Sequence, residues 1–324
     1  MKTILVLGLL VLTSSISAQP ATSIRSFEDA ELSFAYIPNR DFTITGRLDI
    51  EQSGGETRDF FIVIDGGQSG SVNDRAAINP VDPGDAVSYR LVVPSTGMTV
   101  RDFSSGQPSA SEVLSGTIPG ATSGPWRSYV SVDLRLEVDA GQLEDSEPEY
   151  ADDLVMRLYY GRVNDPSSYN PNNPQATATL SIRGNVDPFV QVALVEAGAS
   201  FPPGRPGPVR VTERTMDFGE LTAGSQQRYD LLVDANALFT ISVSSENSGV
   251  MRVVSGDDDP DVPTTVPYRL RLNGQSVDLS GGASVVGVSL SGFRWAIEAE
   301  ILPFGVAAAG DYEDVVLITV SADQ

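Results

Sequence analysis

Carboxylates are almost the only side chains in this sequence that could carry out chemistry. The chain contains no cysteine and no histidine, and its single lysine is Lys2. This composition excludes disulfides, histidine-ligated zinc, histidine-based catalytic triads and lysine Schiff bases. Two kinds of chemistry remain open, namely calcium binding by oxygen ligands and hydrolysis by a pair of carboxylates.

The densest group of carboxylates is the run GDDDPD, which contains Asp257, Asp258, Asp259 and Asp261. Calcium takes several oxygen ligands, but this run lacks the spaced pattern of a dedicated calcium loop, and its proline favours an exposed turn. A second acidic stretch, residues 144–149, is typical of a solvated loop. We therefore expect no catalytic residue, no cofactor and no dedicated metal site, and calcium binding at 257–261 stays open.

Charge and the first residues indicate where the protein acts. The formal net charge of −22 argues against nucleic acid and anionic membrane surfaces as partners, because both require a basic surface. Residues 1–18 have the features of a secretory signal peptide, namely Lys2, an apolar run from Ile4 to Leu12 and small residues up to Ala18. That run is too short to span a bilayer as a helix. We expect an exported protein without membrane insertion.

The elements that must position these residues are strands. No long apolar stripe with a helical period follows residue 18. Short alternating runs recur instead, separated by clusters of glycine, proline, serine, asparagine and aspartate. This pattern predicts an all-β protein with two immunoglobulin-like β-sandwiches in tandem, at residues 19–184 and 185–324. The proline-rich segment 201–208 marks a boundary or an exposed crossing.

The two halves resemble each other in several stretches that occur in the same order. The matched pairs are LSF (Leu32) with MDF (Met216), GRLDI (Gly46) with YDLLV (Tyr229), FFIVI (Phe60) with LFTISV (Leu238), VSYRLVV (Val87) with VPYRLRL (Val266), and YADDLVMRLYY (Tyr150) with YEDVVLITVSA (Tyr312). Two copies of one sandwich explain this order. Asp152, Asp153 and Asp314 follow the last pair of tyrosines, and we expect them to cap backbone groups near a turn.

One difference in spacing points to a surface-binding region. Tyr89 and Tyr150 are 61 positions apart, whereas Tyr268 and Tyr312 are 44 apart, and the surplus of 17 falls between Val93 and Tyr129. This insertion is rich in glycine, proline and serine but also carries bulky apolar residues. Loops on a rigid scaffold often bind partners, and exposed apolar patches often mark interaction sites. The residues expected to contact an abiotic or host surface are Met98, Val100, Phe103, Ile118 and Trp126. The alternative is that these side chains fold back and close one end of the N-terminal core.

The last strand of the sequence raises the question of what pairs with its far edge. Gly310 and Asp311 signal a turn, and a run rich in β-branched residues begins at Tyr312. Val316, Ile318 and Val320 fall on one face, because a strand alternates sides at every residue. Unpaired edges recruit other chains. We expect another polypeptide to pair with this edge.

Three motifs resemble those of a known family, the spore coat protein U-like domain, which is also the subunit of archaic chaperone–usher pili. They are VPYRLRLNG, the Phe-Gly of MDFGEL, and the closing run AAGDYEDVVLITVSA. The resemblance covers residues 216–322 and extends through the repeat to residues 32–160. Members often carry cysteines near the start of the domain, and this chain has none, so its packing must replace that crosslink.

The resemblance implies an incomplete immunoglobulin-like sandwich that a strand from a neighbouring subunit completes. The acceptor groove would contain Tyr312, Val316, Ile318 and Val320, and the partners would be a periplasmic chaperone, an usher and the adjacent pilus subunit. The N-terminal sandwich has two strands that could close it within the chain, 176–182 or 189–195. We therefore expect a two-domain tip adhesin, which would be in the periplasm in transit and then at the cell surface. The alternatives are a fibre or structural subunit without a surface target, and a secreted β-sandwich carbohydrate-binding protein or carboxylate hydrolase.

Overall fold

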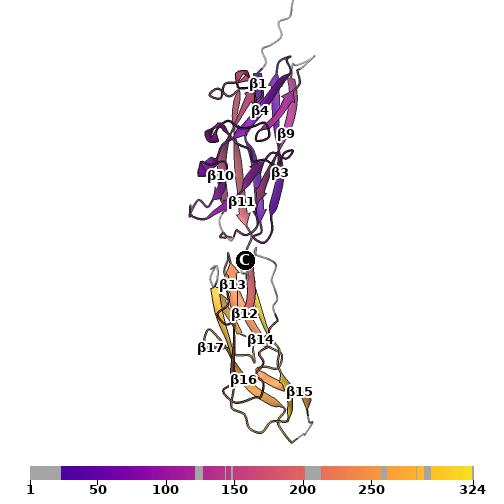
Figure 1. Ribbon diagram of the computed structural model, residues 1–324, viewed down its shortest axis with the longest axis vertical. Coiled ribbons are helices and arrows are strands. Elements are labelled where there is room, and N and C mark those ends of the chain that lie inside the picture. Colours follow the sequence, from indigo (N-terminus) through magenta and orange to yellow (C-terminus); the bar gives the residue numbers. More distant parts are fainter. Residues whose placement is uncertain are drawn as a thin grey trace, which may run out of the picture.

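The protein is built almost entirely of β-strands, as the sequence predicts. The structure is a computed structural model that describes residues 23–120, 127–142, 144–146, 149–200, 213–256, 261–281, 283–287 and 293–322. Helical structure in these residues is limited to three short 3-10 turns, η1 (Gly67–Ser69), η2 (Phe103–Ser105) and η3 (Pro166–Ser168). Figure 1 shows two elongated groups of strands that follow one another along the long axis of the molecule. No helix among the described residues is long and apolar enough to cross a membrane.

Two sheets form the N-terminal sandwich. Sheet A has the order β1 (Ser23–Phe27), β3 (Phe42–Ser53), β9 (Arg127–Val138), β7 (Arg90–Val92). Sheet B has the order β2 (Ala30–Tyr36), β11 (Ala176–Val186), β10 (Tyr150–Tyr160), β4 (Arg58–Ile64), β8 (Leu114–Ile118), and β5 (Ala76–Ile78) joins it to β6 (Ala86–Ser88). One hydrophobic core lies between them, because alternate residues of both sheets point inward. β11 continues to Val186, so this strand runs past the boundary predicted at residues 184 and 185.

Two further sheets form the C-terminal sandwich. Sheet C has the order β12 (Val190–Glu196), β13 (Gln226–Ala235), β19 (Phe293–Ile301), β16 (Thr265–Leu272), β15 (Val250–Gly256), β20 (Gly310–Glu313), with β17 (Gln275–Ser276) on β16. Sheet D has the order β18 (Ala283–Gly287), β14 (Phe239–Ser245), β21 (Val316–Ala322). A second, separate core lies between these sheets. The proline-rich segment 201–208 lies outside the described residues, between β12 and β13 along the chain.

The strand order confirms the internal repeat. β1, β3, β9 and β7 of sheet A match β12, β13, β19 and β16 of sheet C, and β10, β4 and β8 match β21, β14 and β18. The register agrees as well. Gly46 pairs with Leu134 in sheet A, and Tyr229 pairs with Ile297 in sheet C, so GRLDI and YDLLV occupy the same place.

Asn236 connects the two sandwiches. Its side-chain Nδ2 donates to the carbonyl of Glu144 at 3.0 Å and to that of Asp187 at 3.1 Å. Its Oδ1 accepts from the backbone N–H of Phe189 at 2.7 Å. Because Asn236 is almost fully buried, these bonds fix the start of β12 against the loop that precedes β10.

Candidate functional site

The edge of β21 is the feature of the C-terminal sandwich that differs most from its counterpart. On one side β21 pairs antiparallel with β14, with Ile318 opposite Val243 and Val320 opposite Ile241. On the other side, β21 pairs with no strand in the part of the chain that the structure describes. β12 lies beside it, but the ladder of β12 joins it to β13. The outward N–H and C=O groups of β21 therefore form an unpaired edge.

The side chains of β21 alternate as the sequence predicts. Val316, Ile318 and Val320 pack against the C-terminal core but are only half-buried. Leu317, on the other face, is 62% exposed. Tyr312, in β20, is half-buried and donates from its hydroxyl to the carbonyl of Ala308 at 2.7 Å. The four residues predicted to form the acceptor groove are thus each half-buried against the C-terminal core.

The matching strand of the N-terminal sandwich is covered on both sides. β10 pairs antiparallel with β4, where Met156 lies opposite Ile64, and with β11, where Met156 lies opposite Ala178. Its inward side chains Leu154, Met156 and Leu158 are fully buried. β11 is therefore the strand that closes this sandwich within the chain. Of the two candidates, 176–182 has this role, and 189–195 belongs almost entirely to β12 in sheet C.

A tyrosine–aspartate pair anchors the closing motif in both sandwiches. The hydroxyl of Tyr89 donates to Oδ2 of Asp152 at 2.6 Å, and Oδ1 of that aspartate accepts from the backbone N–H of Gln68 at 2.8 Å. In the C-terminal sandwich Tyr268 donates to Asp314 at 2.5 Å, and Asp314 accepts from the N–H of Asn247 at 3.0 Å. The two aspartates do cap backbone groups, as predicted.

The electrostatics of this pair follow from burial. Burial raises the pKa of the Tyr89 hydroxyl above its usual value, and the negative charge of Asp152 adds to that shift. Burial also raises the pKa of Asp152, and the hydrogen bond from Tyr89 opposes the shift. Burial and Asp314 together raise the pKa of Tyr268. The hydroxyls of Tyr89 and Tyr268 stay protonated as hydrogen-bond donors at neutral pH, so they position the strands.

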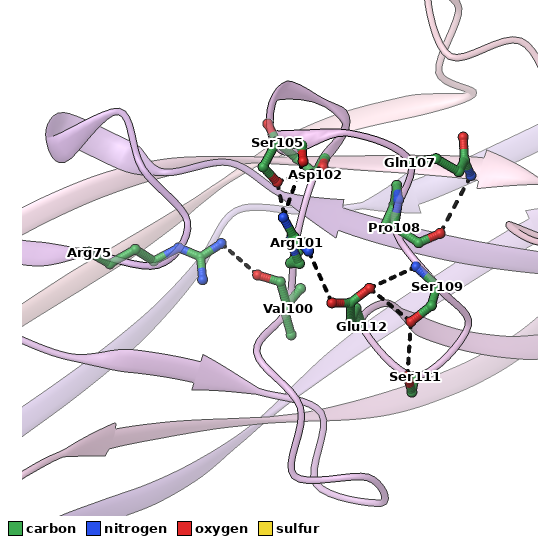
Figure 2. Close-up of polar contacts among 10 residues, drawn as sticks. All are labelled: Arg75, Val100, Arg101, Asp102, Ser105, Gln107, Pro108, Ser109, Ser111 and Glu112. Carbon is green, nitrogen blue, oxygen red and sulfur yellow. Dashed lines mark hydrogen bonds and ion pairs between the residues drawn. The ribbon is translucent and has the colours of Figure 1, made fainter.

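The prediction that the insertion projects its apolar residues into solvent is wrong for Val100 and Ile118. Both side chains are fully buried in the N-terminal core. Buried Arg75 holds the segment in place, because its Nη2 donates to the carbonyl of Ile64 at 2.7 Å and to that of Val100 at 2.9 Å. Figure 2 shows the bond to Val100. The alternative that was left open, in which these residues close the core, describes them correctly.

Phe103 is half-buried in a second apolar cluster, which we call the outer cluster. The outer cluster contains Phe61, Val63, Val113, Tyr159, Val163, Phe103 and Tyr169. It lies on the side of sheet B that faces away from the core, because Phe61 alternates with the core residues Phe60 and Ile62. The ring of Phe103 lies 5.6 Å from that of Tyr159 and 5.8 Å from that of Tyr169. The insertion therefore covers this face.

The continuous apolar run FFIVI indicates a strand buried on both faces, and this signal was missed. Polar contacts hold the insertion in place: Arg101 pairs with Glu112 at 3.2 Å, and Glu112 accepts from the N–H and hydroxyl of Ser109 (Figure 2).

Of the other two residues predicted to contact a surface, Met98 has a side chain that is 46% exposed. Trp126 lies outside the described residues.

The sequence predicts neither a dedicated metal site nor a catalytic site. Among the described residues, no group of three or more acidic side chains is placed to hold a metal ion. Residues 257–260 of the acidic run, where calcium binding was left open, lie outside the described part of the chain.

Comparisons with known proteins complete the description. No protein-family profile and no curated protein matches the chain, so the resemblance to the spore coat protein U-like domain is not confirmed. Similar solved structures include the CsuC–CsuE chaperone–tip adhesion subunit pre-assembly complex from archaic chaperone–usher Csu pili of Acinetobacter baumannii, at 12% identity and a TM-score of 0.42, covering 93% of this chain and 99% of that one.

Two others are adhesins. CfaE, the adhesive subunit of CFA/I fimbria of enterotoxigenic Escherichia coli, is 10% identical with a TM-score of 0.33, covering 93% of this chain and 94% of that one. The CupB6 tip adhesin of Pseudomonas aeruginosa is 11% identical with a TM-score of 0.30, covering 92% of each chain. At these TM-scores the similarity does not by itself establish a relationship.

Proposed function

We propose that this protein is a subunit of a chaperone–usher type surface fibre, and that it accepts along β21 a β-strand from another polypeptide. The observation that carries the proposal is the difference between β10 and β21. Both strands present an inward apolar row, but β11 covers the row of β10, and the described residues place no strand over the row of β21. Strand addition would pair the outward backbone groups and bury the apolar row together.

The composition of β21 supports an accepting role. Sheet edges that must stay unpaired are usually protected by charged residues, proline or bulges. β21 reads VLITVSA and contains neither charge nor proline, and its ladder with β14 runs without a register shift. The edge therefore lacks the features that would keep another strand away.

The proposal extends to the position in the fibre and to the partners. β11 already occupies the place beside β10 in the N-terminal sandwich, so we place that sandwich at the tip and the C-terminal sandwich toward the fibre. The strand would come from a periplasmic chaperone during transit and from an adjacent subunit after passage through an usher. We propose export through residues 1–18 and a role in assembly and adhesion without catalysis. The structural neighbours named above are subunits of this kind, and the assignment here rests on β21.

A peptide experiment tests the accepting role. In the full chain carrying Trp126→Phe, Trp295 of β19 is the one tryptophan and reports unfolding of the C-terminal sandwich. A synthetic nonapeptide with alternating apolar and polar residues should raise the Tm of that transition. The same peptide with two central prolines should not, because proline cannot donate to a ladder. An identical Tm with both peptides would refute the accepting role.

A further inference from the structure

Two carboxyl groups lie against each other beside the junction of the two sandwiches. Glu144 belongs to the loop that precedes β10, and Asp85 comes directly before β6. Both are half-buried, and their carboxyls form a hydrogen bond with each other. Two carboxylates repel, so this bond exists only while one of the two carries a proton. The position of the loop therefore depends on that proton.

Asp85 is the fixed member of the pair. Its Oδ2 accepts from the hydroxyl of Tyr150 at 2.5 Å and from Nδ2 of Asn79 at 3.0 Å. Burial and the adjacent Asp85 raise the pKa of the Tyr150 hydroxyl, so this group remains a donor through the neutral range. Glu144 is the member that can move, because it lies on the loop.

The groups around Glu144 make its ionised form unfavourable at this place. The charges of Asp85 and of Asp145, on the same loop, both act on it, and the Tyr150 hydroxyl lies near. The backbone N–H of Ala86 donates to Glu144, and from the C-terminal sandwich the neutral amide of Asn236 contacts the loop. When Glu144 ionises, three acidic side chains therefore repel one another across the loop.

The same loop carries contacts between the sandwiches. The carbonyl of Glu144 accepts from Nδ2 of Asn236 at 3.0 Å, and the N–H of Ser146 donates to the carbonyl of Asn236 at 3.2 Å. We call these two bonds the interdomain contact. The side chain of Asn236 also binds the linker between β11 and β12, at the carbonyl of Asp187 and the N–H of Phe189. Loss of the interdomain contact would leave the sandwiches joined through this linker.

From this arrangement we propose that the interdomain contact is a pH-sensitive switch of the orientation of the two sandwiches. Protonated Glu144 holds the loop against Asp85 and so presents the loop to Asn236. Loss of the proton separates the two carboxyls, moves the loop and frees the sandwiches to reorient about residues 187–189. The accepting edge of β21 plays no part in this switch.

The loop can shift without unfolding its own sandwich, because both of its ends are anchored. The backbone N–H of Gln142 donates to the hydroxyl of Tyr36 at 3.1 Å, and Oε1 of Gln142 accepts from the N–H of Ser88 at 2.7 Å. At the other end, Tyr150 pairs with Gly184 in the ladder of β10 and β11. The change is therefore confined to the segment that contacts Asn236.

The switch should act near neutral pH. Burial, the hydrogen bond with Asp85 and the charges of Asp85 and Asp145 raise the pKa of Glu144 from 4.5 to about 7. The form with the interdomain contact therefore binds this proton more tightly than a form with Glu144 in solvent. The preference for that form is complete below pH 4.5 and is lost as pH rises through about 7.

Energy transfer across the junction tests the proposal. The chain contains no cysteine, so Thr43→Cys and Ser244→Cys give each sandwich one exposed position for a dye. Time-resolved energy transfer on the full chain then measures the distribution of distances between the sandwiches. We expect a narrow distribution at about pH 5 and a broader one at about pH 9, while circular dichroism shows both sandwiches folded. The same distribution at both pH values would overturn the proposal.

Three variants identify the group responsible. Glu144→Gln can still bind Asp85 but cannot ionise, so we expect a narrow distribution at both pH values. Asn236→Ala removes the side chain that binds the loop, so we expect a broad distribution at both. Exposed Glu149→Gln, in the same loop, is the matched control and should keep the response of the unsubstituted chain.

The variants also contain the results that would refute the switch. If Glu144→Gln still broadens the distribution at high pH, or if Glu149→Gln abolishes the broadening, another group is responsible. If folded Asn236→Ala gives the narrow distribution at both pH values, the interdomain contact does not hold the sandwiches. Should Asn236→Ala fail to fold, the two glutamate variants decide alone.

Discussion

β10 and β21 occupy matching places in the two sandwiches and differ in burial. The inward side chains of β10 are fully buried, whereas those of β21 are half-buried, although both rows are apolar and alternate in the same way. The difference comes from a third strand, because β11 covers β10 and pairs in turn with β2. The comparison teaches that one sequence motif can form a complete core or an accepting edge, depending on whether a suitable strand follows it in the chain.

Matched truncations of these two strands give the largest expected effect. Met156→Ala removes a fully buried side chain, and we expect it to lower the free energy of unfolding of the N-terminal sandwich by about 2–5 kcal/mol. Ile318→Ala removes a half-buried one from the matching position, and we expect a loss of about 1 kcal/mol in the C-terminal sandwich. Calorimetry on the full chain measures both transitions. Equal losses would show that the edge of β21 is covered.

The outer faces of the two sandwiches also differ, and Phe103 tests that difference. The outward residues of β4 include Phe61 and Val63, whereas those of β14 are Thr240, Ser242 and Ser244. Phe103 packs on the apolar outer face. We therefore expect Phe103→Ala to destabilise the N-terminal sandwich by about 2 kcal/mol, less than a fully buried phenylalanine. Exposed Met98→Ala is the matched control and should change its Tm little. An unchanged Tm for Phe103→Ala would show that this side chain does not pack on the outer face and is exposed to solvent.

The paired tyrosines predict a smaller, graded effect. Tyr89→Phe removes the hydrogen bond from this hydroxyl to Oδ2 of buried Asp152, and we expect a loss of about 2 kcal/mol. Tyr268→Phe removes the equivalent bond to half-buried Asp314, and we expect about 1 kcal/mol, since water can reach the carboxylate. Urea denaturation of each variant measures the losses. A larger loss for Tyr268→Phe would contradict the burial difference between the sandwiches.

The smallest effect is the dependence on pH that Glu144 should give the N-terminal sandwich between about pH 4.5 and 7. Burial, a hydrogen bond with Asp85 and the charges of Asp85 and Asp145 raise the pKa of Glu144 from 4.5 to about 7. The folded state therefore binds this proton more tightly than the unfolded state, and the stabilisation present below pH 4.5 is lost as pH rises through 7.

Because Glu144 is partly exposed, we expect a loss of about 1 kcal/mol across that range, which is well below the value for full burial. Glu144→Gln should remove this part of the pH dependence, as followed by the Tm of the N-terminal transition between pH 4 and 8. An unaltered pH profile in the variant would show that another group is responsible.

The sequence predicted the strands and the repeat but not how the insertion packs. Period-two alternation around Val316 and Ile318 is a local property, and the matched motifs gave the order of strands in both sandwiches. The place of Phe103 depends on the outer face of β4, which is distant in sequence. The continuous apolar run FFIVI indicates a strand buried on both faces, and this would have predicted that the outer face of β4 is covered. The choice of β11 over β12 as the closing strand likewise depends on pairing across the fold, which alternation does not determine.

Amide hydrogen exchange along β21 tests the central claim most directly. In an antiparallel edge strand, every second N–H points away from the paired neighbour. At low protein concentration, alternate amides of Val316–Ala322 should exchange rapidly, whereas those of Leu154, Met156 and Leu158 and their neighbours in β10 should be protected throughout. Appending a strand with the sequence of β11, Ala176–Val186, should protect the amides that exchange rapidly. Uniform protection along β21 before any strand is added would contradict the account.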